Sequence, residues 1–410
     1  MFTWMLISIP LIYWAWMLID AIRARHSLLC LQPITSIEQT QNHPFPVRTS
    51  YPSLSVIIAA RNEALHIERT VKSLLRQSYR SFGDYEIIVV NDRSTDTTGQ
   101  TLDQLKMWTS KNGYAEVLTV IHINDLPAGW LGKNHALWRG SQKARGEIIL
   151  FSDADIDFHP DALLTAVRFM IDHHLDHLTL TPRLISRSYL THLFGHYFMF
   201  AFSLFKRLWW VNQRSRAQDG IGVGAFNLLR SSVYRAIGTH QAFAMRPDDD
   251  LALGQRVKHH HFQQYLAIGK ALLTVEWYES IAQASRGIEK NAFAGMGYHA
   301  LLAIIALIGQ LWFFLFPYFA LFLNIPLSYK LIWSIIIVLM LTLYAYLTQR
   351  LSHLQWHELL TFPLAALLFN AIFFRALVLT WLRGGIQWRG TFYPLKELKR
   401  HMNRAQNENR

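Results

Sequence analysis

The middle of the chain alternates short apolar runs with longer amphipathic stretches. The apolar runs are rich in β-branched residues, as buried strands are, and cover Ser53–Ala60, Tyr85–Val90, residues 115–123 and residues 147–151. Stretches with helical periodicity follow the first three runs, over residues 60–78, after residue 96 and over residues 132–146. Strands that alternate with helices imply an α/β fold with a doubly wound, mostly parallel sheet.

Much longer apolar runs lie at both ends of the chain. Phe2–Ile22 has the ~20 residues that a helix needs to cross a bilayer. Three more runs crowd the C-terminal third, at His299–Leu323, Leu331–Leu347 and Leu359–Leu382. The pattern therefore predicts a membrane anchor (1–23), a cytoplasmic domain (24–298), transmembrane α-helices (299–382) and a basic tail (383–410).

Basic residues beside these runs predict the orientation. Arg23 and Arg25 follow the first run, which favours a cytoplasmic position for the chain behind it. Three later crossings would put the C-terminus outside, yet the basic tail favours the inside. The last run contains Pro363, Asn370 and Arg375, which indicates an interfacial or re-entrant segment. We expect a cytoplasmic tail.

Composition narrows the possible partners. Hydrophobic residues make up 51% of the chain, charged residues 17%, and the formal net charge is +12. Such a charge suits an anionic membrane surface or a phosphorylated substrate. The cations are spread over the membrane flanks, so the pattern does not favour a nucleic-acid partner. The lone cysteine, Cys30, excludes an internal disulfide and fits a reducing compartment.

Polar clusters stand where three of the predicted strands end: ARNE, NDRSTD and SDAD. Ligands of such sheets bind at the carboxyl ends of the strands. Asp153 and Asp155 are two residues apart, so on extended backbone both side chains would point the same way. Crowded carboxylates favour a bound cation, and hard oxygen ligands suit Mg²⁺ or Mn²⁺. Asp157 and His159 fit the loop and the start of the next helix.

The ordered motifs AARNE, VVNDRSTD, GKNHAL, SDADI, GVGAFNLLR, DDDLALG and QASRG resemble those of membrane-bound family 2 glycosyltransferases. The chain is most similar to the subset near the hopene-associated and carotenoid-acid enzymes. The resemblance implies a GT-A fold and an inverting transfer of sugar from a nucleotide-sugar donor, usually a UDP-sugar. The implied acceptor is a membrane lipid such as a hopanoid, carotenoid, polyprenyl phosphate or glycerolipid. The implied location is the bacterial inner (plasma) membrane.

The resemblance also assigns roles to the strand-end residues. Asp153 and Asp155 match the motif that holds the metal and the diphosphate. Asp92 matches the aspartate that contacts the base, Glu63 a position near the ribose, and Lys133 a cation near the phosphates. Simpler interpretations are a helix cap by Ser94 or Asp96 and an ordinary exposed lysine.

Two later motifs complete the implied site. Asp250 matches the catalytic base, with Asp249 beside it and Asp248 as a helix cap; acids also suit any helix N-terminus. Gln283 and Arg286 in QASRG match a QxxRW element in which arginine meets the diphosphate. Gly287 stands where that element has tryptophan. This departure disfavours a processive polysaccharide synthase, which remains one alternative. A non-catalytic membrane scaffold with a relic transferase domain is another.

Two further features have simpler explanations. Leu190–Trp210 is apolar and aromatic and indicates an interfacial amphipathic helix or plain core, because a crossing there would separate Asp153 from Asp250. His173, His174 and His177 lack the partners of a zinc site.

Overall fold

The computed structural model describes residues 2–34, 50–114, 116–294, 299–388 and 391–400. Its internal contacts divide the chain into two compact units. The first, here the sheet unit, contains Leu29–Arg183 and Val211–Glu276. The second, here the helical unit, contains Met1–Leu28, Leu184–Trp210 and Trp277–Arg400.

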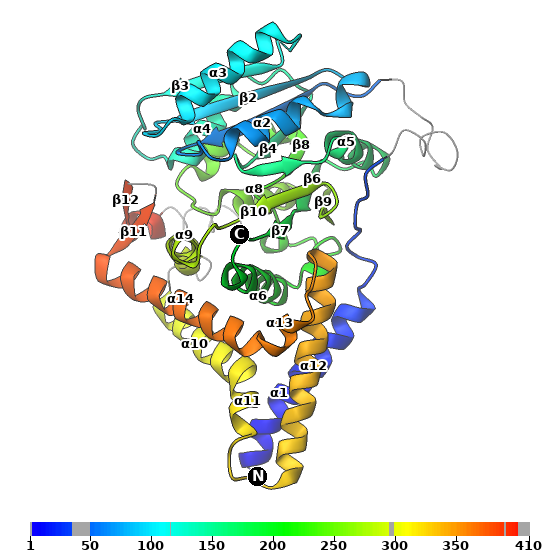
Figure 1. Cartoon of the computed structure of the whole chain (residues 1–410), viewed down its shortest axis with the longest axis vertical. Coiled ribbons are helices and arrows are strands. Elements are labelled where there is room, and N and C mark those ends of the chain that lie inside the picture. Colours follow the sequence, from blue (N-terminus) through cyan, green and yellow to red (C-terminus); the bar gives the residue numbers. More distant parts are fainter. Residues whose placement is uncertain (1, 35–49, 115, 295–298, 389–390, 401–410) are drawn as a thin grey trace. The chain divides into compact units, whose positions relative to one another are not determined.

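A seven-stranded sheet with the order β3-β2-β1-β4-β8-β6-β9 forms the centre of the sheet unit (Figure 1). Its strands are β1 (Leu54–Ala60), β2 (Tyr85–Asp92), β3 (Leu118–Ile123), β4 (Ile148–Ser152), β6 (His177–Thr181), β8 (Asn227–Arg230) and β9 (Gln264–Ile268). All neighbouring strands pair in parallel except β8, which runs antiparallel to β4 and β6. The predicted mostly parallel α/β sheet is therefore confirmed.

Helices connect these strands, as predicted. They are α2 (Ile67–Leu75), α3 (Thr98–Lys111), α4 (Gly132–Ser141), α5 (Ala162–Asp172), α7 (Ser231–Ala236) and α8 (Asp249–His259). α4 packs on β1 and β2, where Ile57, Ile88 and Leu137 belong to one buried cluster. Gly140 allows this close approach, because a Cβ there would lie 2.5 Å from the Ile57 Cγ2 atom.

Short elements complete the sheet unit. β5 (Ile156–Phe158) pairs antiparallel with β10 (Leu273–Glu276), and the boundary between the units falls within β7 (Arg183–Ile185). Single 3₁₀ turns are η1 (Ser78–Ser81), η3 (Ala217–Asp219) and η4 (His240–Phe243). β5 begins directly after the acidic stretch at the end of β4, so the chain bends sharply there.

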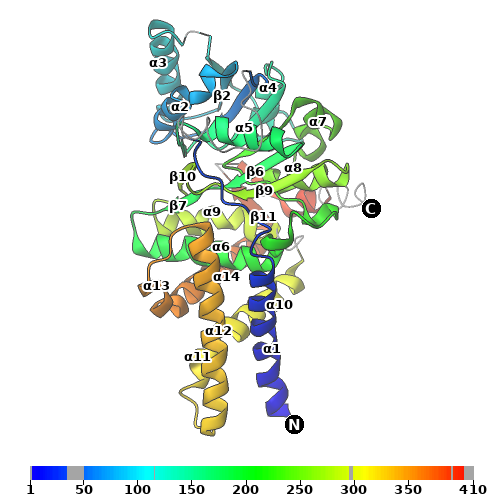
Figure 2. The same cartoon turned by 90° about the vertical axis from the view of Figure 1, so that its right-hand side faces the viewer.

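The helical unit gathers segments from three parts of the sequence. Its elements are α1 (Phe2–Arg23), α6 (Tyr189–Lys206), η2 (Leu208–Trp210), α9 (Ile281–Ala294), α10 (Ala300–Gln310), η5 (a π-helical turn, Leu311–Leu315), α11 (Phe316–Ala320), α12 (Leu327–Leu351), α13 (His357–Leu360), α14 (Phe362–Arg383), β11 (Gly385–Trp388) and β12 (Thr391–Pro394). α1 and α12 lie side by side (Figure 2). Trp14, Phe200 and Tyr344 are buried in their common core.

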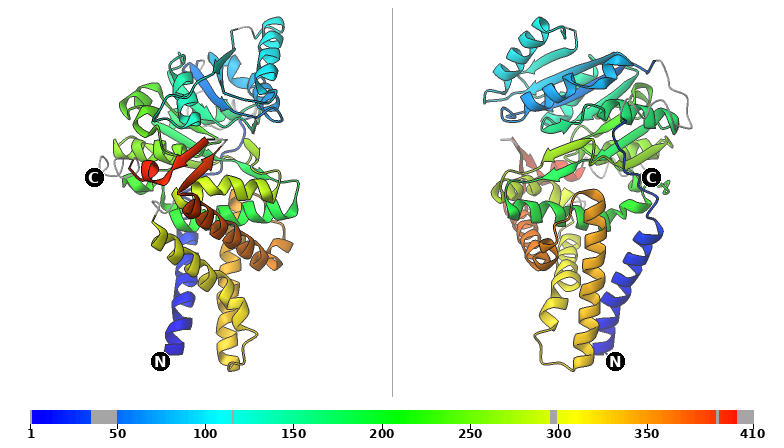
Figure 3. Two further views of the ribbon diagram at one scale, coloured as in Figure 1. Left: turned by 90° about the vertical axis from the view of Figure 1, so that its left-hand side faces the viewer. Right: turned by 45° about the vertical axis from the view of Figure 1, so that its right-hand side comes forward.

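Three helical segments among the described residues are long and apolar enough to cross a membrane: Ala300–Ala320, Leu327–Leu351 and Phe362–Arg383. They coincide with the three predicted C-terminal runs. Within the helical unit, α14 runs across the direction of α1 and α12 rather than along it (Figure 3). The aromatic run 190–210 forms mainly α6, which packs against α12 and α14.

Candidate active site

The acidic stretch at the end of β4 forms a turn. The backbone N–H of Asp153 donates to the carbonyl of Gly224 at 3.0 Å, and residues 154 and 155 form the turn that leads into β5. Ala154 is buried, and its carbonyl accepts from Thr70 Oγ1 at 2.9 Å. The expectation of extended backbone is wrong here, because the chain must bend to enter β5. Asp153 and Asp155 are both half-buried.

Lys133 joins two acids that are far apart in the sequence. Its Nζ lies 2.8 Å from Asp153 Oδ1 and 3.2 Å from Asp249 Oδ2. Burial alone would lower the pKa of Lys133, but the carboxylates of Asp153, Asp249 and Asp250 raise the pKa above its ordinary value. The ammonium group is therefore firmly charged. The interpretation of Lys133 as an ordinary exposed lysine is wrong, because only 17% of its side chain is exposed.

Asp250 lies in the first turn of α8, next to this cluster. Its Oδ2 accepts a hydrogen bond from the Gly224 N–H at 2.9 Å, and its Oδ1 accepts one from the Leu251 N–H at 2.8 Å. Burial, followed by the charge of Asp249, raises the pKa of Asp250 to about 6. A carboxyl with this pKa is ionised at neutral pH and is basic enough to accept a proton.

Glycines let the GVG loop, Gly222–Gly224, come this close to α8. A Cβ on Gly222 would lie 2.0 Å from the Asp250 carbonyl oxygen, and one on Gly224 would lie 2.5 Å from Asp153 Oδ2. Gly224 therefore contacts both Asp153 and Asp250. A small pocket at this place is lined by Lys133, Ser152, Gly224, Asn227, Asp249 and Asp250, among others.

Asp248 occupies the N-cap position of α8. Within the described residues its carboxylate makes no capping bond to the helix; it binds the Arg246 guanidinium, with Arg246 Nε to Asp248 Oδ1 at 2.9 Å. The expectation of a capping side chain is therefore wrong. The nearby cation competes with the helix N–H groups for the same oxygens.

Asp92 ends β2 and is 2% exposed. Its carboxylate pairs with Arg93 at 2.8 Å and lies 3.8 Å from Arg61. Gly132 opens α4 directly beside it, since a Cβ there would lie 2.4 Å from Asp92 Oδ2. The glycine before Lys133 thus allows α4 to bring its N-terminus to the end of β2.

The loops after β1 and β2 are tied together. Asn62 Oδ1 accepts from the Thr95 N–H at 2.8 Å, and the half-buried Glu63 donates its N–H to Thr98 Oγ1 at 2.8 Å. Asp96 Oδ1 accepts from the Thr98 N–H at 3.0 Å, so Asp96 does stabilise the start of α3 as the simpler interpretation held. The Asn91 side chain forms a hydrogen bond to His122 on the neighbouring strand β3, with 3.0 Å between Asn91 Nδ2 and His122 Nδ1. These contacts fix the loop that presents Asp92.

Gln283 and Arg286 lie on α9, in the helical unit. Gln283 Oε1 accepts from the Glu279 N–H at 2.7 Å, and Arg286 is exposed. Their contact with a donor stays a prediction. The glycine in place of tryptophan has a local explanation, because a Cβ on Gly287 would lie 2.5 Å from the Tyr278 hydroxyl oxygen. The Tyr278 ring fills the space that a larger residue 287 would need.

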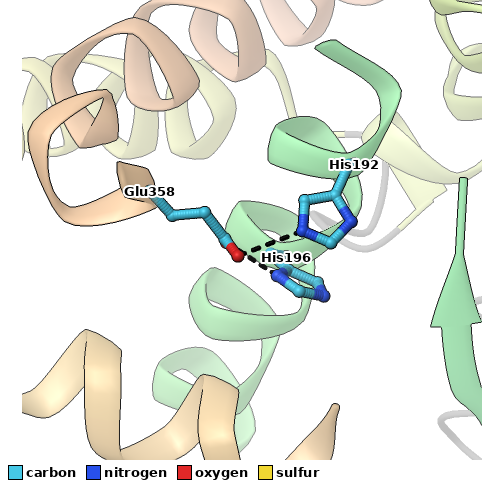
Figure 4. Close-up of side chains that lie close together, drawn as sticks. All are labelled: His192, His196 and Glu358. Atoms are coloured by element: carbon cyan, nitrogen blue, oxygen red, sulfur yellow. Dashed lines mark hydrogen bonds and ion pairs between the residues drawn. The ribbon is translucent and has the colours of Figure 1, made fainter. Parts of the chain in front are cut away.

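One cluster of possible metal ligands was not predicted from the sequence. His192 and His196 on α6 meet Glu358 on α13 in the helical unit (Figure 4). The spacing of four between the histidines in THLFGH was a visible signal, since residues i and i+4 share one face of a helix. The acidic partner, 162 residues away from His196, was not visible in the sequence.

Comparisons with known proteins identify a family domain, similar sequences and a similar fold. Residues 55–218 match the sequence profile described as glycosyl transferase family 2. A 4,4'-diaponeurosporenoate glycosyltransferase of Staphylococcus aureus strain RF122 is 26% identical over 85% of this chain and 90% of its own length. The same enzyme from strain USA300 is 25% identical with the same coverage.

Among solved structures, the mannosyltransferase PcManGT from Pyrobaculum calidifontis, in complex with GDP-Man and Mn²⁺, is similar over 93% of this chain and 96% of that one. The TM-score is 0.52 and the sequence identity is 17%. This likeness concerns the fold. With its GT-A type sheet, a family 2 glycosyl transferase domain over residues 55–218 and relatives that are glycosyltransferases, the chain is a glycosyltransferase.

Proposed function

We propose that this enzyme is an inverting transferase that moves a sugar from a nucleotide-sugar donor to a lipid acceptor in the membrane. In this proposal Asp250 is the base that takes the proton of the acceptor hydroxyl, and Asp249 supports it. The observation that carries the proposal is the raised pKa of Asp250, in a pocket shared with Lys133 at the end of β4. Proton abstraction by such a group contributes typically ~10²–10⁴-fold to a rate.

Asp153 and Asp155 would hold a divalent metal, Mg²⁺ or Mn²⁺. The residues fit such an ion, since both are carboxylates at one strand end and Asp153 already neutralises a cationic group, the Lys133 ammonium. When bound, the ion would act as a Lewis acid on the departing diphosphate. The solved mannosyltransferase with a similar fold contains Mn²⁺ and GDP-Man.

The remaining donor contacts come from the loops described above. Asp92 would meet the base, Glu63 the ribose and Lys133 the phosphates, and a UDP-sugar is the expected donor. Gln283 and Arg286 would reach the diphosphate from α9. The position of Lys133 is the strongest support for this arrangement. Its buried ammonium contacts Asp153 and Asp249, and the same positive charge could bind a donor phosphate next to these carboxylates.

A lipid acceptor is supported by the helical unit. The relatives are named for transfer to 4,4'-diaponeurosporenoate, and three described segments of this chain are long and apolar enough to span a membrane. We place the enzyme in the bacterial plasma membrane with the sheet unit in the cytoplasm. The acceptor is then a membrane lipid of the carotenoid, hopanoid, polyprenyl phosphate or glycerolipid type.

The direction of α14 supports a cytoplasmic C-terminus. The start of α1 and the connection between α11 and α12 lie at the same end of the helical unit (Figures 1 and 2). α14 runs across these helices, and the side chain of Arg375 in its middle is 44% exposed and pairs with Glu289 at 3.6 Å. A charge in mid-helix disfavours a position in hydrocarbon. We therefore propose that α1, α10–α11 and α12 cross the membrane and α14 lies at its cytoplasmic surface, with a cytoplasmic tail.

One experiment tests the function. Membranes that contain the enzyme are incubated with a panel of labelled UDP- and GDP-sugars, with Mg²⁺ or Mn²⁺ or with a chelator, and the lipids are then extracted. We expect metal-dependent label in one discrete lipid product. Label in a long water-soluble polymer would instead support the processive synthase, and the absence of any nucleotide-sugar binding would support the relic scaffold.

A further inference from the structure

The cluster of His192, His196 and Glu358 lies outside the proposed transfer site. His192 Nε2 is 3.0 Å from Glu358 Oε1, and His196 Nδ1 is 2.7 Å from Glu358 Oε2 (Figure 4). The Glu358 side chain is 0% exposed, that of His196 1% and that of His192 14%. One ligand atom from each residue lies within 4.8 Å of the others. We propose that these three residues bind a transition-metal ion, with zinc preferred.

The donor set selects the type of metal. Two imidazole nitrogens and one carboxylate oxygen are ligands of zinc sites, in which a water completes the tetrahedron. Mg²⁺ and Mn²⁺ prefer all-oxygen surroundings of the kind found at Asp153 and Asp155. The two sites would therefore prefer different ions.

The groups around the cluster hold its ligands in place. Tyr344 donates its hydroxyl to Glu358 Oε2 at 3.0 Å, and the Gln355 N–H donates to Glu358 Oε1 at 2.7 Å. His196 Nε2 lies 3.0 Å from Ser352 Oγ. In metal sites the second ring nitrogen typically donates a hydrogen bond to an outer group, and outer groups donate to the ligating carboxylate. These bonds fix the tautomer and the direction of each ligand.

Without a metal the same atoms can form a simple hydrogen-bonded cluster. Glu358 then accepts four bonds, from Gln355, Tyr344 and the two histidines. With a metal, the tautomer of His196 changes: its proton moves to Nε2 and is donated to Ser352, and Nδ1 faces the ion. The partial exposure of His192 provides a side from which a metal could enter.

The location shows which segments a bound ion would connect. α6 carries both histidines, whereas Glu358 and Ser352 belong to the segment between α12 and α14. A bound ion would join α6 to that segment within the helical unit. It would thereby stabilise the core in which Tyr197, Phe200 and Phe362 pack.

The test uses the full-length enzyme purified in detergent. Its metal content is measured by mass spectrometry, and the metal-depleted protein is titrated with Co²⁺, whose visible spectrum reports tetrahedral nitrogen and oxygen ligands. We expect about one zinc ion per chain and a Co²⁺ spectrum that zinc abolishes. His192→Gln and Glu358→Gln should lose both signals, whereas the exposed neighbour variant His353→Gln should retain them.

A second variant distinguishes metal binding at this cluster from metal binding at the proposed transfer site. An Asp153→Asn/Asp155→Asn variant should keep its zinc and its Co²⁺ spectrum although transfer fails. Wild-type enzyme without zinc and without a Co²⁺ spectrum would overturn the proposal and leave a hydrogen-bonded cluster only. This result needs no variant to fold, and it would leave the proposed transfer function untouched.

Discussion

The ammonium of Lys133 lies 2.8 Å from Asp153, and the same group lies 3.2 Å from Asp249. This lysine therefore links the proposed metal-binding turn after β4 with the proposed base region at the start of α8. A substitution of Lys133 should affect donor binding and the base together.

We expect Lys133→Met to raise the KM for the donor and to lower kcat. Removing the positive charge also takes away an influence that lowers the pKa of Asp250. The acidic limb of the pH–rate profile should therefore move to higher pH. Steady-state kinetics at several pH values would show both effects. The exposed Lys106→Met is the matched control and should behave as wild type; an equally unchanged Lys133→Met would contradict the role.

The raised pKa of Asp250 predicts a pH dependence of transfer. Burial and the charge of Asp249 favour the protonated carboxyl, so its pKa is about 6 in the folded enzyme. A base must be ionised to act. The rate should therefore rise as the pH increases through about 6 and level off above it. Measurement of kcat/KM from pH 5 to 8 would test this, and a rate that does not change over that range would count against Asp250 as the base.

The same shift has a consequence for stability. Because the pKa of Asp250 is higher in the folded chain than in the unfolded chain, the folded state binds more protons between the two values. The contribution of Asp250 to the free energy of unfolding thus falls as the pH rises from about 4 to about 6. At neutral pH, therefore, the ionised carboxylate of Asp250 lowers the free energy of unfolding, although the proposed transfer reaction requires it.

The proposed topology can be tested with the single cysteine of the chain. In a Cys30→Ser background, Asn324→Cys lies between α11 and α12, and Lys399→Cys lies in the region after β12. Both positions are exposed. A membrane-impermeant thiol reagent added to intact cells should label residue 324 and not residue 399. Lys111→Cys, in the sheet unit, is a protected control. Labelling of residue 399 would show that α14 crosses the membrane.

The sheet and its polar strand ends could be predicted from the sequence. Hydrophobic periodicity and β-branched runs such as Tyr85–Val90 depend on the burial of neighbouring residues in the chain, not on distant contacts. It failed where the outcome depends on distant partners. The turn at Asp155 follows from the start of β5, the contact of Asp248 with Arg246 replaces a cap, and Lys133 is held by acids from two other elements. The partnership of Glu358 with His192 and His196 likewise depends on packing within the helical unit.

The most direct test of the central claim compares Asp250→Asn with its neighbour Asp248→Asn. Membranes with each variant receive the labelled donor that the wild-type enzyme uses, and the label in extracted lipid is measured together with donor binding. We predict that Asp250→Asn loses about 10²–10⁴-fold in transfer rate while it still binds donor. Asp248→Asn, whose partner is Arg246, should stay within a few-fold of wild type. Near-normal lipid labelling by Asp250→Asn would contradict the account.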